Sequence, residues 1–234
     1  MDIETLRQKY IGEFTNRGSG EYILKLGLKI HPGDRILDIG ASAGRFAREI
    51  ETAYGQENVV VDSLDRFGKQ QVDEGVVTFS SEDGEEVIFY PNNRIVADIA
   101  EAGVEILPAE VYDKVVSFYA FPTWSGSSEE TWKSLENILR SVKVNGEVRF
   151  YPVWATDAGQ GFSGFDSKLH LGNTLKFLKK HGYQVDFTED EENKGAYRLV
   201  VIKGRNVVPT YDEFVEANRS GISRLVRKIF THGS

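Results

Sequence analysis

The sequence of 234 residues contains no cysteine and no long apolar run. The lack of cysteine excludes disulfide bonds, thiolate catalysis and cysteine-ligated zinc. No stretch is apolar for long enough to cross a bilayer, and the first residues, Met-Asp-Ile-Glu, lack the charged and apolar regions of a secretory signal. We therefore expect a soluble, cytoplasmic protein with no membrane partner and no bound metal.

Positive charge is also scarce. The chain has 28 Lys and Arg residues against 36 Asp and Glu, which gives a net charge of −8. Nucleic acids are bound by clustered Lys and Arg, so this balance disfavours general nucleic-acid binding. Hydrophobic residues make up 40% of the chain, enough for a continuous core. We expect a single domain, with a helical cap over 1–29, a core over 30–203 and a helical extension over 204–234.

The most informative segment is 31–46, where a strand pattern runs into a turn of small residues and then into a helix pattern. Gly40 suits a tight bend, and the residues after it keep the turn low enough for a ligand to lie on the backbone. A strand, glycine turn and helix together present backbone N–H groups to an anionic or carboxylate-bearing cofactor. The candidate cofactor contacts in this segment are Asp38, Gly40, Ala41, Ser42 and Gly44.

The same segment permits two other interpretations. Residues 40–44 match G-x-S-x-G, the nucleophile elbow of the α/β-hydrolases, with Ser42 as nucleophile and His170 or His181 downstream. That elbow normally follows several strands, whereas the first clear strand pattern here is residues 35–39. A nicotinamide dehydrogenase would have a third glycine where this chain has Phe46. Both interpretations account for less of the chain than the one developed below.

Carboxylates follow the next two predicted strands. Residues 58–62 form a β-branched run that ends at Asp62, 22 residues after Gly40. This is close to the spacing of about 20 residues at which an acid binds ribose hydroxyls in dinucleotide folds. Asp65 is the nearest alternative. A third run, residues 94–97, is followed by Asp98 and Ile99.

This ordered series resembles the class I methyltransferases, which use S-adenosylmethionine. In that family an acid in the first strand precedes a G-x-G-x-G-like turn, and here Ser42 replaces the central glycine. Leu107-Pro108 with residues 112–118 is similar to the family's "LP…FDxVxS" strand. Residues 141–148 are similar to its "LKPGG" turn, with Val144 in place of the proline. The resemblance covers about residues 30–203.

The resemblance implies an α/β fold of Rossmann-like, doubly wound type. Its seven-stranded sheet would be mostly parallel with an antiparallel last strand and helices on both faces. It also implies that S-adenosylmethionine binds and that S-adenosylhomocysteine is the product. An acid after the second strand would hold the ribose hydroxyls, one after the third would accept the adenine amino group, and the fourth strand would lie under the methionine end. The residues that take these roles are Asp62 with Ser63, Asp98 with Ile99, and Phe118.

Elements outside this series have their own patterns. Residues 2–29 predict two helices, a segment that in the family often lies over the cofactor. Residues 76–90 predict a β-hairpin in place of the commoner helix. A helix around Leu171, Leu175 and Leu178 should end at Gly182, before a final pair of strands. Residues 211–230 predict a helix that packs on the domain or on a second subunit, as in a homodimer.

The methyl acceptor would meet the loops after the fourth and fifth strands. Their aromatic residues Tyr119, Trp124 and Trp154 could hold a planar or apolar acceptor, or could equally anchor the loops to the core. His170 is the one histidine that we nominate as a general base. The "N/D-P-P-Y" signature of nucleic-acid amino methyltransferases is absent, since residues 120–123 read Ala-Phe-Pro-Thr.

The sequence therefore predicts an S-adenosylmethionine-dependent methyltransferase that acts on a small-molecule acceptor. A second hypothesis is a non-catalytic cofactor-binding or partner subunit that keeps the fold and works through the C-terminal helix. A third is a serine hydrolase that uses Ser42.

Overall fold

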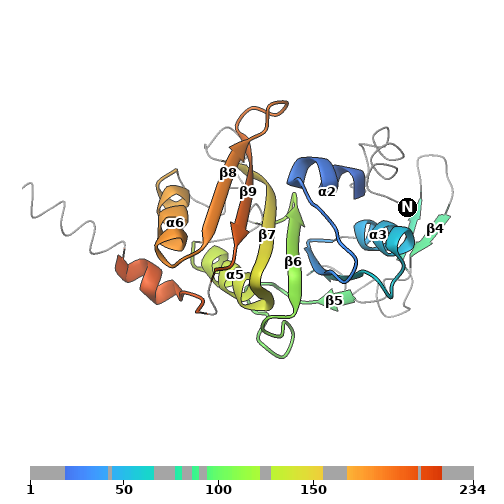
Figure 1. Ribbon diagram of the computed structural model, residues 1–234, viewed down its shortest axis with the longest axis horizontal. Helices are drawn as coiled ribbons and strands as arrows, with labels where there is room; N and C mark the ends of the chain where they lie inside the picture. Colours follow the sequence, from blue (N-terminus) through green and yellow to red (C-terminus); the bar gives the residue numbers. More distant parts are fainter. Residues whose placement is uncertain are drawn as a thin grey trace, which may run out of the picture.

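The computed structural model describes residues 19–41, 44–65, 77–80, 86–89, 94–121, 128–154, 168–204 and 207–217. Within these ranges, seven strands form one mixed sheet in the order β5-β2-β1-β6-β7-β9-β8. Strands β5, β2, β1, β6 and β7 run parallel, and β9 is antiparallel to both of its neighbours, β7 and β8. The bounds are β1 (Arg35–Ile39), β2 (Val60–Asp65), β5 (Arg94–Val96), β6 (Tyr112–Phe118), β7 (Val142–Trp154), β8 (Gln184–Glu189) and β9 (Ala196–Ile202). The predicted α/β class is confirmed (Figure 1).

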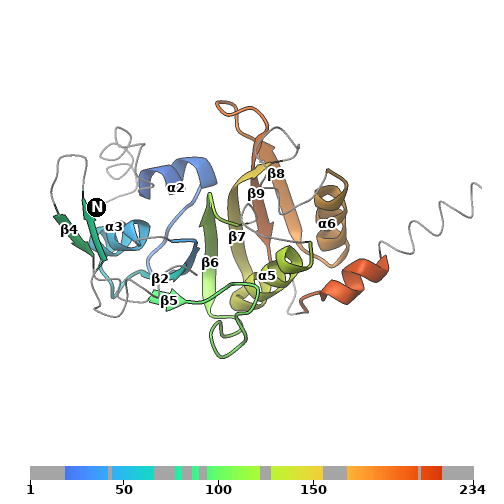
Figure 2. The same cartoon turned by 180° about the vertical axis from the view of Figure 1, so that it is seen from behind.

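The helices α2 (Ser19–Leu26), α3 (Arg45–Tyr54), α5 (Ser128–Ser141) and α6 (Lys168–Lys180) cover the sheet. Two separate hydrophobic clusters show that these helices pack on opposite faces. One cluster joins α2 and α3 to the sheet through Tyr22, Phe46 and Ile50. The other joins α5 and α6 to the sheet through Trp132 and Leu178. In Figure 2, α2 and α3 lie to the left and α5 and α6 to the right.

Alternation along β1 explains this two-sided core. Ile36 belongs to the cluster under α2 and α3, while Leu37 and Ile39 belong to the cluster under α5 and α6. Successive side chains of a strand point to opposite faces, so Asp38 lies on the same face as Ile36. Asp38 is therefore a carboxylate set among apolar contacts under α2.

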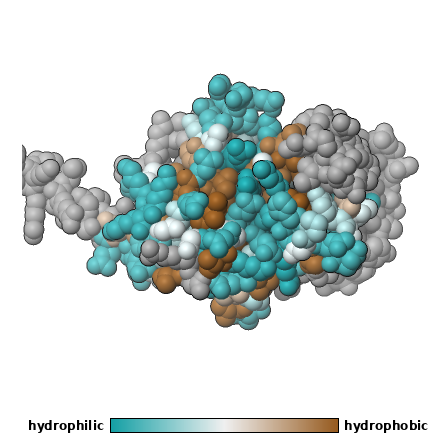
Figure 3. All heavy atoms as spheres, viewed as in Figure 1, coloured by the Kyte–Doolittle hydropathy of each residue, from teal (hydrophilic) through white to brown (hydrophobic). Residues whose placement is uncertain are grey.

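On the face seen in Figure 3, hydrophilic residues cover much of the described surface and apolar patches lie between them.

Several predicted elements coincide with the observed ones. The hairpin over 76–90 is confirmed as β3 (Val77–Ser80) paired antiparallel with β4 (Glu86–Phe89), a separate two-stranded sheet. The predicted strands 94–97 and 112–118 correspond to β5 and β6, and the predicted final pair of strands corresponds to β8 and β9. The second strand differs, because β2 begins at Val60 and continues past Asp62 to Asp65.

The ends of the chain are described in part. Residues 1–18 lie outside the described ranges, so of the two predicted N-terminal helices only the second, α2, is seen. Residues 211–217 are helical, and Phe214 stacks on Trp132 with the ring centroids 4.4 Å apart. This part of the predicted C-terminal helix packs on its own domain, while 218–230 lie outside the described residues. No described helix has the length and apolar character needed to span a membrane.

Candidate functional site

The glycine turn after β1 is held against β2 by its own backbone. The N–H groups of Gly40 and Ala41 both donate to the carbonyl of Leu64, at 2.8 and 3.2 Å. These two amides are therefore used within the protein and are not free to bind a ligand. Gly40 has φ +73°, and Gly44, the N-cap of α3, has φ +75°. Both positions lie in the left-handed region that glycine adopts without strain.

Close packing gives Gly40 a second constraint. A Cβ at this position would lie 2.1 Å from the Cβ of Ala120, in the segment that follows β6. The ends of β1 and β6 therefore meet with no room for a side chain. The close approach that the structure shows at Gly40 is that of Ala120.

Asp38 lies beneath the turn and has no exposed surface. The hydroxyl of Tyr22, on α2, donates to its two carboxylate oxygens at 3.0 and 3.3 Å. On the neighbouring strand, Ser63 is the direct partner of Asp38, and its Oγ is buried without a hydrogen-bond partner in the described structure. Strand, helix and turn thus enclose a small polar site at the carboxyl end of β1.

Asp62 and Asp65 occupy different environments on β2. Asp62 pairs with Leu37 in the middle of the sheet, three residues before the strand ends. Its Oδ2 accepts hydrogen bonds from Nε and Nη2 of Arg35 at 3.1 and 2.8 Å. The phenol of Tyr112 is close by, and burial together with the Asp62 charge raises the pKa of that phenol. Asp62 is therefore part of an internal charged group, although its position in the sequence had suggested the end of the strand.

Asp65 is the acid that ends β2. It follows Leu64, whose carbonyl holds the glycine turn, and it is half-buried. Three residues of strand separate it from Asp62 by about 10 Å, and an odd number of residues places the two side chains on opposite faces. The structure therefore places Asp65, the alternative considered from the sequence, beside the turn.

Asp98 follows β5, the next strand outward, and caps a turn. Its Oδ1 accepts the N–H of Ala100 at 2.9 Å, and its carbonyl accepts the N–H of Glu101. Ile99 is partly buried against the core, and its carbonyl accepts a hydrogen bond from Asn137 of α5 at 2.8 Å. Because β1, β2 and β5 are neighbours and run parallel, Asp38, Asp65 and Asp98 follow one another along a single edge of the sheet.

Aromatic rings occupy the other side of the turn, where β6 ends. The ring of Phe118 is buried and packs on Tyr22 and Tyr151 at centroid distances of 5.0 and 5.7 Å. Tyr119 is 37% exposed and has φ +59°. Its ring meets Phe118 edge-on at 4.9 Å. A non-glycine residue with positive φ is uncommon, and such residues cluster at functional sites.

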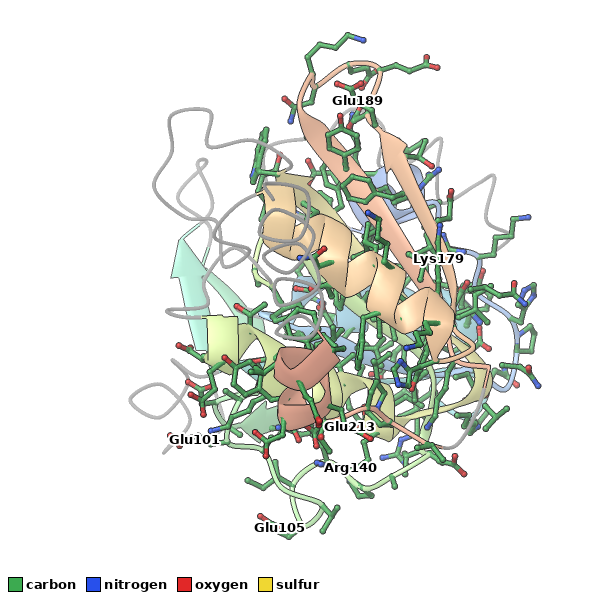
Figure 4. All side chains as sticks on the ribbon, turned by 90° about the vertical axis from the view of Figure 1, so that its left-hand side faces the viewer. Glu101, Glu105, Arg140, Lys179, Glu189 and Glu213 are labelled. Carbon is green, nitrogen blue, oxygen red and sulfur yellow. The ribbon has the colours of Figure 1, made fainter. Side chains whose placement is uncertain are left out.

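The turn between β8 and β9 lies at the same edge of the sheet as the glycine turn and forms ion pairs with α2. Asp190 accepts a hydrogen bond from the hydroxyl of Tyr151 and pairs with Lys25 of α2 at 3.1 Å. Lys25 also pairs with Glu192 at 2.6 Å, while Arg149 donates to the Leu26 carbonyl at 2.8 Å. Figure 4 shows Glu189, where the turn begins, at one end of β8.

This charged group perturbs the titration of its members. Burial raises the pKa of the Asp190 carboxyl, but hydrogen bonds from Tyr151, from the Glu192 backbone and from Lys25 outweigh it, so that the pKa lies below its ordinary value. Burial raises the pKa of Tyr151, and its hydrogen bond to Asp190 raises it further. At neutral pH the group therefore consists of a carboxylate, a neutral phenol and an ammonium.

Neither a protein-family model nor a curated protein matches the sequence. Solved structures do match. The S-adenosylmethionine-dependent methyltransferase SibL has a TM-score of 0.51 at 17% identity, over 87% of this chain and 59% of SibL. The CurJ carbon methyltransferase has a TM-score of 0.50 at 14% identity, over 86% and 58% of the two chains. The aminoglycoside resistance methyltransferase NpmB1 has 0.50 at 16%, over 73% and 87%.

The chain has the class I methyltransferase fold. The identities are low, so this likeness establishes the fold alone, and this chain spans less than two thirds of SibL and of CurJ. In this methyltransferase fold, the glycine turn and the carboxyl ends of β1, β2, β5 and β6 form one continuous edge.

Whether this edge suits S-adenosylmethionine can be tested on the residues present. The cofactor carries a positively charged ammonium and a sulfonium, a ribose diol and an adenine amino group. The edge offers three carboxylates, one each for the positively charged end, the ribose diol and the adenine amino group, together with a closely packed glycine turn and the hydroxyl of Ser63, which has no partner among the described residues. The donor set of the methyltransferase fold therefore fits the cofactor.

Some of the other predicted site residues fall outside the described part of the chain. Ser42 and Trp124 lie outside the described residues, and so does the side chain of His170, which belongs to the first turn of α6. Trp154 ends β7 and packs partly buried against the cluster under α2 and α3, which matches the loop-anchor interpretation. Among the described residues, no group of acids and histidines could hold a metal ion.

Tyr22 and the Lys25–Asp190 pair are not among the residues that the sequence predicts for the site. Tyr22 fits an apolar helix face, which predicts burial but no partner. Residues 189–194 have the composition of a charged turn. Their run of acids was the available signal, but the partner Lys25 lies 165 residues away in the sequence.

Proposed function

We propose that this protein is an S-adenosylmethionine-dependent methyltransferase that acts on a small-molecule acceptor. The observation that carries the proposal is the order of Asp38, Asp65 and Asp98 on adjacent parallel strands beside a glycine turn. Adjacent strands are about 4.8 Å apart, so the three positions span about 10 Å across the sheet, and the strand register displaces them further along the strand direction. This arrangement suits an extended nucleoside with an amino-acid tail.

Each acid has a role that its environment supports. Asp98 with Ile99 holds the adenine at the outer strand. Asp65 accepts the ribose hydroxyls, a role that we move here from Asp62 because Asp62 is engaged by Arg35 inside the sheet. Asp38 lies under the turn, where it is shielded from solvent and its charge attracts the positively charged methionine end.

When bound, S-adenosylmethionine supplies a methyl group on a sulfonium, which an acceptor displaces directly. Positioning of the acceptor and exclusion of water then supply much of the catalysis. Tyr119 is suited to position an acceptor, because it is exposed at the end of β6 and its ring is braced edge-on by Phe118 and Tyr151. An aromatic surface of this kind favours a planar or apolar acceptor over a phosphate-bearing one.

Thermal unfolding of the full chain with different ligands tests the proposal. S-adenosylmethionine and S-adenosylhomocysteine should each raise the melting temperature, with about 2.7 kcal/mol of stabilisation when the ligand is at 100 times its Kd. NAD+ and ATP serve as controls and should give no shift. A shift with NAD+ alone, or no shift with either sulfur ligand, contradicts the proposal. Methyl transfer to a panel of small aromatic acceptors then tests the activity, with an Asp65→Asn variant as the control.

A further inference from the structure

Tyr22 is held in place on three sides, although it comes from a helix outside the sheet. Its ring stacks on Phe46 of α3 with the centroids 4.2 Å apart and the planes 10° from parallel. On another side it packs on Phe118 at 5.0 Å. The side chain is 2% exposed, and its hydroxyl reaches both oxygens of Asp38.

The helix that carries Tyr22 is fixed at both ends. At its start, the N–H of Ser19 donates to Glu49 of α3 at 2.6 Å. At its end, Lys25 pairs with the β8–β9 turn, and Arg149 donates to the Leu26 carbonyl. A cation at a helix C-terminus also interacts favourably with the helix dipole. The Tyr22 hydroxyl is therefore directed at Asp38 by a rigid support.

A carboxylate beneath the turn needs a fixed orientation if its charge is to act on a ligand above it. The hydroxyl of Tyr22 lies 3.0 and 3.3 Å from the two carboxylate oxygens of Asp38, so its bond sets the direction in which the carboxylate faces. Hydrogen bonds and charges act more strongly in a site that excludes water.

We propose that Tyr22 is a positioning residue for the methionine end of the cofactor, which it serves by orienting Asp38. This inference rests on the proposed function. It assigns to α2 a specific part in recognising the amino-acid half of the ligand. The adenosine half, which faces Asp65 and Asp98 on the far side of the turn, is independent of Tyr22.

The test compares two ligands on one pair of variants. Tyr22→Phe removes the hydroxyl and keeps the stacked ring. Calorimetry with S-adenosylhomocysteine should show binding weakened about tenfold, because the carboxylate that faces the ligand loses its fixed orientation, an effect about as large as one ordinary hydrogen bond. 5′-Methylthioadenosine carries the adenosine and the sulfur but no amino-acid tail, and its affinity should stay within about twofold.

Tyr183→Phe is the matched control. Its hydroxyl donates to the Val207 carbonyl at 3.3 Å, it is also buried, and it packs in the cluster under α5 and α6. Neither ligand should bind it differently from the wild type.

Every other outcome overturns either this inference or the proposed function. If Tyr22→Phe binds S-adenosylhomocysteine as well as the wild type or better, or loses affinity for both ligands equally, the inference is overturned. A Tyr22→Phe chain that does not fold shows a purely structural hydroxyl and overturns it too. If the wild type binds neither ligand, the proposed function itself fails. If the wild type binds both ligands and Tyr22→Phe binds them equally well, only the inference about Tyr22 fails.

Discussion

Asp65 and Asp62 should lose different properties when each is changed to asparagine. Asp65 lies half-buried beside the glycine turn, whereas Asp62 is 2% exposed and bound by Arg35 inside the sheet. Asparagine keeps the shape and removes the charge. Asp65→Asn should therefore impair cofactor binding, and Asp62→Asn should impair folding.

The magnitudes follow from the two environments. A hydrogen bond to a charged group contributes about 1.5–3 kcal/mol, so Asp65→Asn should weaken S-adenosylhomocysteine binding by about tenfold to 150-fold. Breaking a buried ion pair costs about 3–5 kcal/mol, but the Arg35 side chain is 48% exposed and can be solvated. We therefore expect Asp62→Asn to lower the free energy of unfolding by about 1–2 kcal/mol.

Calorimetry with S-adenosylhomocysteine and urea unfolding, on both variants and the wild type, measure the two effects separately. The expected pattern is reciprocal, with affinity lost in Asp65→Asn and stability lost in Asp62→Asn. The reasoning is refuted if Asp62→Asn is as stable as the wild type but binds weakly while Asp65→Asn binds normally.

Further changes test the turn, the C-terminal packing and the response to acid. Gly40→Ala should cost about 2–5 kcal/mol in urea unfolding, from its positive φ and its overlap with Ala120, and adding Ala120→Gly should recover the overlap portion of about 1–3 kcal/mol. No recovery in the double variant contradicts the contact. Phe214→Ala should lower stability by about 3 kcal/mol and leave S-adenosylhomocysteine affinity unchanged by calorimetry. Burial raises the pKa of Asp113, but the bonds from Lys143 and the Arg35 backbone lower it below its ordinary value, so its contribution to stability is present above about pH 4 and is lost in more acidic solution. In Lys143→Met this acid-dependent loss should shrink when unfolding is followed from pH 6 to pH 2.

Local patterns in the sequence predicted the elements, whereas contacts between distant segments determined the site. The strand and turn over 35–44 were predictable, because the alternation of β1 and the glycines lie within a few residues of one another. The choice between Asp62 and Asp65 was not, since both follow the same β-branched run. Only the pairing of Ile39 with Leu64 shows which acid reaches the turn.

The contact between Tyr22 and Asp38 was beyond local reasoning for the same physical reason. Tyr22 fits an apolar helix face, which predicts burial but not a partner. Its hydroxyl meets Asp38 because α2 is fixed across the sheet by Lys25 and Asp190, residues that are adjacent only in the folded chain.

A crystal structure of the full chain with S-adenosylhomocysteine tests the central claim most directly. The account predicts the adenine beside Asp98 and Ile99, the ribose hydroxyls within hydrogen-bond distance of the Asp65 carboxylate, and the methionine end over the turn above Asp38. A ligand bound elsewhere, or a ribose held by Asp62, would contradict it.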